Sequence, residues 1–340
     1  MTRTLTLMAI GLAALLAACT PKVAPLGEKP SNPHISDAGF ITDDGLTLPY
    51  RRWQPKGGAP EVKAVVLALH GFNDYSKAFD KVPGAPGVGP TLAAQGVAVY
   101  AYDQRSFGNA PNRGVWPGND VLVGDFKTFS RALKELYPNV PLYAIGESMG
   151  GAVVLSALAS ESPPPVAGAI LASPAVWARP TMPMFYRLAL WFGAHFLPSY
   201  KPTGESLGRM ASDNIEMLRD NGRDPLFIKK TRIDAVYGLT NLMDEALTAT
   251  SQIKQTPILY LYGRHDEIIP KNAAERAMKT LTENDPNVRT AFYEDGWHMI
   301  MRDKNAPAVI ADVAAFIQRP KGPLPSGADQ QALTRLAQKD

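Results

Sequence analysis

The stretch Gly146-Glu147-Ser148-Met149-Gly150 has the residue types and spacing best suited to chemistry in this 340-residue chain. A short apolar run, residues 141–145, precedes it, and small and apolar residues, 151–159, follow it. The first run is typical of a buried strand and the second of a helix. In that context Gly-x-Ser-x-Gly predicts a tight strand-to-helix turn that lifts the serine hydroxyl above a sheet. Glycine suits both flanks because a Cβ there would clash in so sharp a turn.

A serine hydroxyl is a poor nucleophile at neutral pH, so it needs a neighbouring base, usually histidine, and an acid that orients the base. In sites built on such a turn, the chain order is Ser, then Asp or Glu, then His. His298 follows a predicted last strand at residues 289–293, and Asp266 follows a predicted strand at residues 258–262. We therefore predict catalytic roles for Ser148, Asp266 and His298.

Other acids and histidines fit these roles less well. Asp295 would lie on the same loop as the predicted base, poorly placed to support the ring from behind. His265 adjoins the predicted acid and cannot easily face both that acid and the serine, so we interpret it as structural or pocket-lining. His195 is interpreted as a histidine on a helix face, and His34 falls in the N-terminal segment.

The negative oxygen that forms on an attacked carbonyl needs two backbone N–H donors. The N–H of Met149 follows the nucleophile at the start of a helix, where backbone donors lack an intrahelical partner. The second donor should come from the loop after the strand that ends in His70-Gly71, where Phe72 is the better candidate. We predict that Phe72 and Met149 form an oxyanion hole and that His70 is structural.

Continuous apolar runs alternate with helix-like segments along the middle of the chain. Such runs are typical of strands buried on both faces, and the alternation predicts an α/β fold with a mostly parallel central sheet flanked by helices. Two shorter strands, residues 39–42 and 47–54, flank Asp43-Asp44-Gly45, which is a hairpin signal. The other predicted strands are residues 64–71, 97–103, 142–145, 169–173, 258–262 and 289–293, and the predicted helices are residues 119–137, 149–160, 271–281 and 306–317.

No strand is predicted between residues 173 and 256. A structureless loop of that length inside a domain is improbable, so we expect a helical insertion. Residues 184–197 predict a helix with one face in the core. Two further interpretations of its apolar surface stay open, the wall of an acyl-binding pocket and a contact with a membrane.

The first residues have the layout of a signal peptide: a positive start, an apolar run over residues 7–18, and small residues before the single cysteine, Cys19. The run is too short for a transmembrane helix, which needs about 20 apolar residues. Leu16-Ala17-Ala18-Cys19 resembles the bacterial lipobox, which implies a lipidated Cys19 and a membrane anchor in the bacterial cell envelope. Thr20 in place of aspartate favours the outer membrane if the source is Gram-negative. An ordinary secretory signal that ends near a cysteine is the alternative.

Both ends of the mature chain are expected to attach loosely. Residues 20–38 hold four prolines and few large apolar groups, so we expect them not to pack and to act as a tether. The polar residues 319–340 are predicted to form a loosely attached tail.

Composition and motifs argue against several function classes. A net charge of +3 without basic runs argues against nucleic-acid binding. A single cysteine allows no internal disulfide and no cysteine-based metal site. We find no His/Asp/Glu spacing typical of a metal site and no glycine-rich phosphate loop, so neither metal nor cofactor is expected. Nothing in the sequence indicates an obligate protein partner.

Five stretches are similar to the α/β-hydrolase superfamily, and more narrowly to its lysophospholipase and monoacylglycerol lipase branch. They are His70-Gly71-Phe72, residues 102–108, 146–151 and 263–270, and Gly296-Trp297-His298. In this branch a helical cap follows the strand after the nucleophile turn. The resemblance implies a hydrolase core at residues 39–174 and 253–318, with a cap at 175–252 between the two parts. Before the core lie the signal peptide (1–18) and the lipidated cysteine with its tether (19–38), and the tail (319–340) follows it.

Taken with the resemblance, these features predict a membrane-anchored serine hydrolase that cleaves carboxylic esters through an acyl-enzyme. The apolar insertion and the lipid anchor favour lipids with a single acyl chain, either lysophospholipid or monoacylglycerol. A general small-ester esterase, a peptidase and an acyltransferase use the same fold and stay as alternatives. A non-catalytic lipid-binding lipoprotein is an alternative from another class, which the ordered set of Ser148, Asp266 and His298 disfavours.

Overall fold

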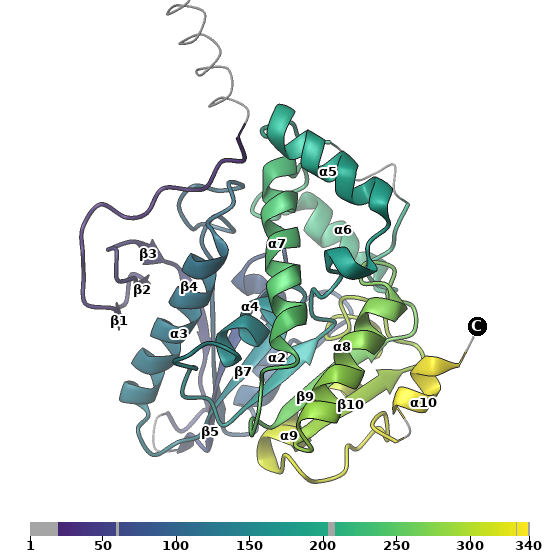
Figure 1. The fold of residues 1–340 in the computed structure, drawn as a ribbon. Helices are drawn as coiled ribbons and strands as arrows, with labels where there is room; N and C mark the ends of the chain where they lie inside the picture. Colours follow the sequence, from purple (N-terminus) through teal and green to yellow (C-terminus); the bar gives the residue numbers. More distant parts are fainter. Residues whose placement is uncertain (1–19, 59–60, 203–207, 331, 339–340) are drawn as a thin grey trace, which may run out of the picture.

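Seven strands form the central sheet of the computed structural model, which describes residues 20–58, 61–202, 208–330 and 332–338 (Figure 1). Their spatial order is β10-β9-β8-β7-β5-β6-β4, and every neighbouring pair is parallel except β4 and β6. The predicted mostly parallel α/β sheet is confirmed. The strands are β4 (Tyr50–Trp53), β5 (Ala64–Leu69), β6 (Val97–Tyr102), β7 (Leu142–Glu147), β8 (Gly168–Ala172), β9 (Ile258–Gly263) and β10 (Val288–Tyr293).

Helices cover both faces of this sheet because successive strand residues point to opposite faces. Val65, Leu67 and Leu69 join a core with α3, α4 and α8, whereas Val66 and Ala68 join a core with α2 and α9. Burial on both faces explains why the strands are continuous apolar runs in the sequence. These helices are α2 (Val88–Ala93), α3 (Asn119–Leu136), α4 (Met149–Leu158), α8 (Lys271–Asn284) and α9 (Ala306–Gln318).

The carboxyl ends of β5, β7, β9 and β10 meet at one edge of the sheet because these strands run parallel. The loops that follow them carry Phe72, Ser148, Asp266 and His298, respectively. Ligands of open α/β sheets bind outside this edge. The fold therefore gathers the predicted site residues from segments more than two hundred residues apart.

The chain between β8 and β9, residues 173–257, is called the cap segment here. Its described part contains the 3₁₀ turn η3 (Arg179–Thr181) and the helices α5 (Met184–Phe196), α6 (Ile215–Arg223) and α7 (Ile233–Ala249). α7 packs on α4, and α5 packs on α7 at one end of the molecule (Figure 1). The expected core face of residues 184–197 is largely wrong, because Ala194 is the one buried residue of α5.

The prediction that residues 20–38 do not pack was wrong. Lys22 donates its backbone N–H to Asp234 Oδ2 at 3.2 Å, and Ala24 donates to the carbonyl oxygen of Trp116 at 2.7 Å. Ala24 is buried, and Val23 forms a β-bridge with Trp116. Backbone amides make these contacts, and an extended, proline-rich segment is well suited to present them. We call residues 20–24 the N-terminal strap.

A small antiparallel sheet follows the strap. It consists of β1 (His34–Ile35), β2 (Phe40–Ile41) and β3 (Thr47–Leu48), in that spatial order. The predicted hairpin at Asp43-Asp44-Gly45 joins β2 to β3, and Gly45 adopts the positive φ of 81° that the turn requires. The second predicted strand is divided, since β3 stays in the small sheet while β4 joins the central sheet.

The described C-terminal residues 319–330 and 332–338 cover the edge of the central sheet, so the expectation of a loosely attached tail was also wrong. Leu324, Ala328 and Leu336 are buried, and Phe292 of the edge strand β10 donates its N–H to the carbonyl oxygen of Ala328 at 2.9 Å. The helix α10 (Ala332–Ala337) packs on the same strand. Covering an edge strand removes a template for unwanted strand pairing.

Within the described ranges, no helix combines the length and hydropathy that crossing a bilayer requires. Cys19 and the apolar run before it lie outside the described residues.

Candidate active site

Ser148 occupies a strained turn between β7 and α4. Its backbone has φ 51° and ψ −113°, a conformation that non-glycine residues rarely adopt and that is typical of functional sites. Steric contacts require glycine at both flanking positions. A Cβ on Gly146 would come within 2.6 Å of the carbonyl oxygen of Gly150, and one on Gly150 within 2.2 Å of the carbonyl oxygen of Leu69. The turn therefore depends on both glycines of the motif.

His298 and Asp266 lie on neighbouring loops, after β10 and β9, and contact each other directly. The Nδ1–H of His298 donates to Asp266 Oδ2 at 2.9 Å, and both side chains are buried. The other carboxylate oxygen, Oδ1, accepts the backbone N–H groups of Ile268 at 2.8 Å and Ile269 at 2.9 Å. These bonds fix the carboxylate and leave Nε2 of the imidazole as the acceptor that faces away from it.

Burial lowers the pKa of His298, but the Asp266 carboxylate, through its charge and its hydrogen bond, and the charge of Glu147 oppose this effect. The balance raises the pKa of His298 above its ordinary value. A carboxylate that supports an imidazole in this way makes the ring a stronger base.

Ser148 and His298 line the same cavity, which has a volume of about 600 Å³. No direct hydrogen bond joins the two side chains in the described structure, and such bonds are often long before a substrate is bound. Apolar side chains from the cap segment form much of the cavity wall. They include Trp177, Met182, Tyr186, Leu190, Val236 and Met243.

Two backbone N–H groups close to Ser148 have no acceptor among the hydrogen bonds of the described residues. One belongs to Met149, the first residue of α4, and the other belongs to Phe72 in the loop after β5. That loop lies against the nucleophile turn, because a Cβ on Gly71 would be 3.4 Å from Ser148 Cβ. Both N–H groups are thus available to a negatively charged oxygen near Ser148.

His70 has a structural environment, as its sequence position suggested. Its Nδ1 lies 2.8 Å from the carbonyl oxygen of Gly71, and its Nε2 accepts the backbone N–H of Gln104 at 3.0 Å. Burial lowers the pKa of His70, which favours the neutral ring that these two bonds require. His265 is exposed and stacks on Trp297, with ring centroids 5.2 Å apart, so it does not line the cavity.

Sequence reasoning missed a buried ion cluster in the wall of the cavity. Arg302 is 2% exposed, and its guanidinium contacts Asp74 Oδ2 at 2.8 Å and Glu147 Oε1 at 2.5 Å. Arg302 and Asp74 belong to the loops that carry His298 and Phe72, and Glu147 is the last residue of β7, directly before Ser148. Arg302 therefore ties together the three segments that carry the predicted base, one predicted oxyanion donor and the predicted nucleophile. The sequence offered one hint of this cluster, because the basic residue Arg302 directly follows the apolar residues 299–301.

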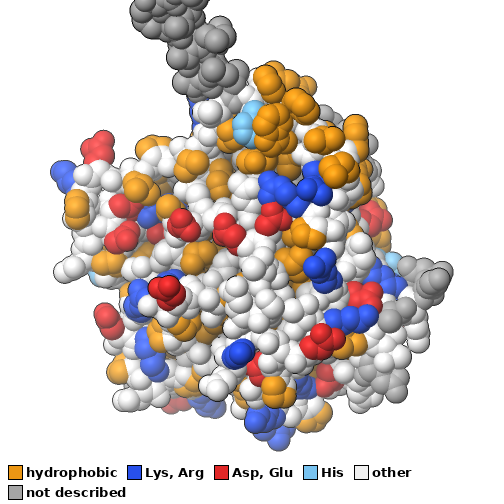
Figure 2. Space-filling view, in the orientation of Figure 1, with side chains coloured by type: hydrophobic (Ala, Val, Ile, Leu, Met, Phe, Trp, Pro, Cys, Tyr) orange, Lys and Arg blue, Asp and Glu red, His pale blue; other side chains and the backbone are white. Residues whose placement is uncertain are grey.

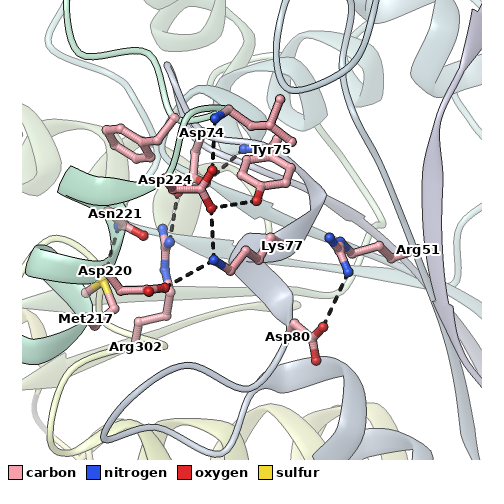
Figure 3. A network of polar contacts seen from close by, with 12 residues as sticks. Arg51, Asp74, Tyr75, Lys77, Asp80, Met217, Asp220, Asn221, Asp224 and Arg302 are labelled. Carbon is pink, nitrogen blue, oxygen red and sulfur yellow. Dashed lines mark hydrogen bonds and ion pairs between the residues drawn. The ribbon is translucent and has the colours of Figure 1, made fainter.

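The same loop after β5 is tied to the cap segment. Lys77 Nζ lies 2.8 Å from Asp224 Oδ2 and 3.1 Å from Asp220 Oδ2, and the Tyr75 hydroxyl donates to Asp224 at 2.7 Å. Figure 3 shows Lys77 between these two carboxylates of the α6 region, with Asp74 and Arg302 close by. We call the contacts of Lys77 and Tyr75 with Asp220 and Asp224 the α6 latch.

Within the described part of the chain, no three His, Cys, Asp or Glu side chains are grouped so that they could hold a metal ion. The site consists of a serine, a histidine and a carboxylate with backbone donors around them. Such a set can add a serine oxygen to a carbonyl and move its proton.

Known proteins share this architecture. The chain is 25% identical to "Monoglyceride lipase" of Mus musculus over 296 residues, which cover 84% of this chain and 88% of that protein. It is 23% identical to "Monoacylglycerol lipase" of Mycolicibacterium smegmatis over 290 residues, covering 83% and 96%. A solved structure of a soluble variant of monoglyceride lipase from Saccharomyces cerevisiae matches with a TM-score of 0.68 at 19% identity, covering 88% of this chain and 100% of that one.

The fold and the site define an α/β-hydrolase, and the relatives make it an enzyme of the carboxylic ester hydrolase type. Residues 60–305 match the family described as "Serine aminopeptidase, S33". Because that match spans most of the chain, the protein belongs to this family.

Proposed function

We propose that the protein is a membrane-anchored serine hydrolase that cleaves esters of lipids with a single acyl chain, monoacylglycerol or lysophospholipid. One observation carries the proposal. Ser148 and the buried pair of His298 and Asp266 lie at an apolar cavity of about 600 Å³. Relatives named as monoglyceride lipases favour monoacylglycerol between the two substrates.

In the proposed reaction, Ser148 Oγ attacks the ester carbonyl carbon while His298 Nε2 takes the hydroxyl proton. The carbonyl oxygen becomes negative and accepts hydrogen bonds from the N–H groups of Phe72 and Met149. When the intermediate collapses, the ester C–O bond breaks and His298 gives its proton to the leaving alcohol. Water then attacks the acyl-enzyme, His298 takes a proton from it, and the fatty acid leaves as the proton returns to Ser148. Asp266 keeps the imidazole oriented and stabilises its charged form throughout.

The lining of the cavity supports an acyl chain as its occupant. Pockets for apolar ligands combine a largely hydrophobic wall with a few polar groups that fix orientation. Here most of the wall comes from apolar residues of the cap segment and from Ile268, Ile269 and Met299, and Ser148 lines the same cavity together with His298. An acyl chain along the apolar wall would bring its ester carbonyl to the polar end.

A peptidase is the alternative that the family name suggests, and the cavity does not favour it. An aminopeptidase needs an unpaired carboxylate to bind the ammonium group of its substrate. The two acidic side chains among the described cavity-lining residues are Asp74 and Glu147, and both pair with Arg302.

The anchoring part of the proposal rests on the lipobox-like sequence that ends at Cys19. In the bacterial cell envelope, lipidation of this cysteine would hold the enzyme at a membrane surface, where its substrates are found, and the outer membrane is favoured in a Gram-negative source. We expect Cys19→Ser to move the protein out of the membrane fraction without changing its turnover of a short soluble ester. Retention of Cys19→Ser in the membrane fraction after a carbonate wash would contradict lipidation as the anchor.

The decisive test compares the detergent-solubilised full chain with its Ser148→Ala variant on matched substrates: short nitrophenyl esters, monoacylglycerols, lysophospholipids and aminoacyl amides. We expect monoacylglycerol or lysophospholipid to be cleaved much faster than short esters, and Ser148→Ala to lower kcat by at least about 10⁴-fold. Turnover of short esters alone would reject the acyl-chain cavity but keep the esterase. Preferred cleavage of aminoacyl amides would establish the peptidase instead.

A further inference from the structure

The ring of Phe72, whose N–H is one of the two proposed oxyanion donors, contacts two buried aromatic side chains. Its centroid lies 5.7 Å from that of Phe107 and 6.2 Å from that of Trp116. Both of these rings are buried, so packing fixes their positions. A side chain that is held in this way restricts its own backbone. The two rings therefore help to place the Phe72 N–H beside Ser148.

Trp116 is itself held by the cap segment. Its Nε1–H donates to Asn119 Oδ1 at 3.1 Å, and the Asn119 amide donates to Glu245 Oε1 of α7 at 2.6 Å. A Cβ on Gly238 of α7 would come within 2.3 Å of Trp116 Cγ, so the indole lies directly on the helix. Trp116 therefore connects Phe72 to α7.

The N-terminal strap joins Trp116 to the start of α7. The N–H of Ala24 donates to the carbonyl oxygen of Trp116 at 2.7 Å, and the N–H of Lys22 donates to Asp234 Oδ2 at 3.2 Å. Asp234 lies in the first turn of α7, is buried, and also pairs with Arg232. The strap thus bridges two elements that are distant in the sequence and that meet behind Phe72 (Figure 1).

Covering apolar surface does not explain the strap. Figure 2 shows hydrophobic side chains gathered at the end of the molecule that α5 forms in Figure 1. The strap leaves them uncovered within the described chain, since Phe185 is 74% exposed, and Val23 of the strap is itself 60% exposed. The contacts of the strap with Asp234 and Trp116 are hydrogen bonds, whose defined length and direction fix positions.

We propose that the N-terminal strap is a positioning element for the oxyanion hole: by holding Trp116 against α7, it keeps the ring and the N–H of Phe72 in place beside Ser148. This role rests on the proposed function, in which that N–H stabilises the negative oxygen. Loss of one such donor costs about 10²–10³-fold in kcat, and a displaced donor should cost less, about tenfold. The strap begins at the residue after Cys19, so the segment proposed to carry the anchor also supports the site.

A matched pair of proline substitutions in the full chain tests this role. Ala24→Pro removes the N–H that donates to Trp116, because proline has no backbone N–H. Leu26→Pro is the control, since Leu26 is exposed, lies outside the strap, and its N–H has no acceptor among the hydrogen bonds of the described residues. Thermal unfolding followed by circular dichroism checks that both variants are folded.

Steady-state kinetics with a short nitrophenyl ester gives the first result. We expect Ala24→Pro to lower kcat by about tenfold and to change KM by less than about twofold, because an oxyanion donor acts mainly on the transition state. Binding of a trifluoromethyl ketone, which adds to a serine oxygen and forms a charged oxygen, should weaken by about the same factor as kcat/KM. A loss of folded enzyme would lower the rate but leave the affinity of the remaining sites unchanged. Leu26→Pro should match the unsubstituted chain.

A second measurement does not depend on turnover. Hydrogen exchange followed by mass spectrometry should be faster in the loop after β5, residues 70–76, in Ala24→Pro than in Leu26→Pro, because the loop has lost part of its support. Faster exchange that is confined to the strap would overturn the proposal, since Trp116 would then not transmit the change to Phe72.

Equal kcat and equal inhibitor affinity in the two proline variants would also overturn the positioning role. A rise in KM at unchanged kcat would overturn it too, and would make the strap part of substrate binding. The proposed function fails separately, if Ser148→Ala retains turnover of the same ester, and the exchange measurement still tests the strap in that case.

Discussion

The loops that carry Ser148 and His298 and the helix α5 border the same cavity but are held in opposite ways. Glycine contacts and the buried cluster around Arg302 fix the loops at the sheet edge. α5 has one buried residue, Ala194, and exposes most of its large apolar side chains. Regions with few buried contacts belong to the low-stability part of a protein. The end of the cavity beside Ser148 and His298 is therefore rigid, and the wall that we propose binds the acyl chain is free to adapt.

This contrast predicts where substitutions have large effects. Changes at the sheet edge should affect catalysis or folding with any substrate, whereas changes on α5 should matter mainly for lipid substrates.

The largest effect is expected from Asp266→Asn. Loss of the carboxylate leaves the His298 imidazole without the partner that fixes its tautomer, and kcat should fall by about 10⁴-fold, as in other sites of this type. Asp295→Asn is the matched control, because Asp295 is exposed on the same loop as His298 and does not contact the ring. Steady-state kinetics with a short ester measures both variants. An equal loss in the two variants would mean that the hydrogen bond to Asp266 does not govern the activity of His298.

The next largest effect is expected on the free energy of unfolding, from substitution of Arg302. Arg302→Met leaves Asp74 and Glu147 as two buried carboxylates without a cation, and breaking a buried pair costs about 3–5 kcal/mol. Arg179→Met removes a partly exposed ion pair with Asp244 in the cap segment, where about 1 kcal/mol or less is expected.

Unfolding of both variants in urea, followed by circular dichroism, measures the difference. If the variant at position 302 loses no more free energy of unfolding than the variant at position 179, the buried cluster does not hold these three segments together. Adding Glu147→Gln to Arg302→Met should recover part of the lost stability, because one of the unpaired charges disappears.

A smaller effect should appear in the pH dependence of kcat/KM. His298 must be neutral to accept the serine proton, so activity falls about tenfold per pH unit below its pKa in the free enzyme. Because Asp266 and Glu147 raise this pKa above the ordinary value of about 6.5, the acid limb should have its midpoint above 6.5. A folded-state pKa above the unfolded value also means that this group stabilises the fold below about pH 6.5 and loses that contribution as pH rises through the raised pKa. A midpoint at or below 6.5 in a pH–rate profile would contradict the influence of the carboxylates.

The contrast between rigid loops and exposed α5 also explains what the sequence could predict. The runs that became β5, β6 and β9 are apolar along their whole length because helices cover both sheet faces, and this pattern is visible without a structure. Ser148, Asp266 and His298 could be proposed because each directly follows such a run, in the order that the turn motif requires. Regular patterns and strand ends were thus enough to predict the fold and to propose these three residues as the site.

The residues that sequence reasoning missed interact through contacts that leave no local pattern. Arg302 pairs with Asp74 and Glu147, which lie far away in the chain, so its burial has no periodic signal. The N-terminal strap packs through backbone N–H groups of Lys22 and Ala24, and composition describes side chains alone. The exposure of α5 stayed undecided for a related reason, since an exposed apolar helix and one in a core have the same sequence pattern.

The smallest effect of a substitution is expected at the α6 latch, where the loops at the sheet edge meet the cap segment, and it concerns the free energy of unfolding. Burial by itself raises the pKa of Asp224. Hydrogen bonds from Lys77 and Tyr75 outweigh this effect, so the pKa falls below its ordinary value, to about 2. A carboxylate with a lowered pKa stabilises the fold above its unfolded pKa of about 3.9 and loses this contribution as pH falls toward 2.

Lys77→Met should therefore reduce the free energy of unfolding at pH 7 by about 1 kcal/mol or less, because the pair is partly exposed, and should weaken the loss of stability between pH 4 and pH 2. Lys81→Met, at an exposed lysine nearby, controls for the change in net charge. If Lys77→Met costs several kcal/mol more than the control, the cap segment is held to the loop after β5 as firmly as the loops around Arg302 are held to one another. The contrast would then apply to α5 alone, since α6 would behave as part of the rigid side of the site.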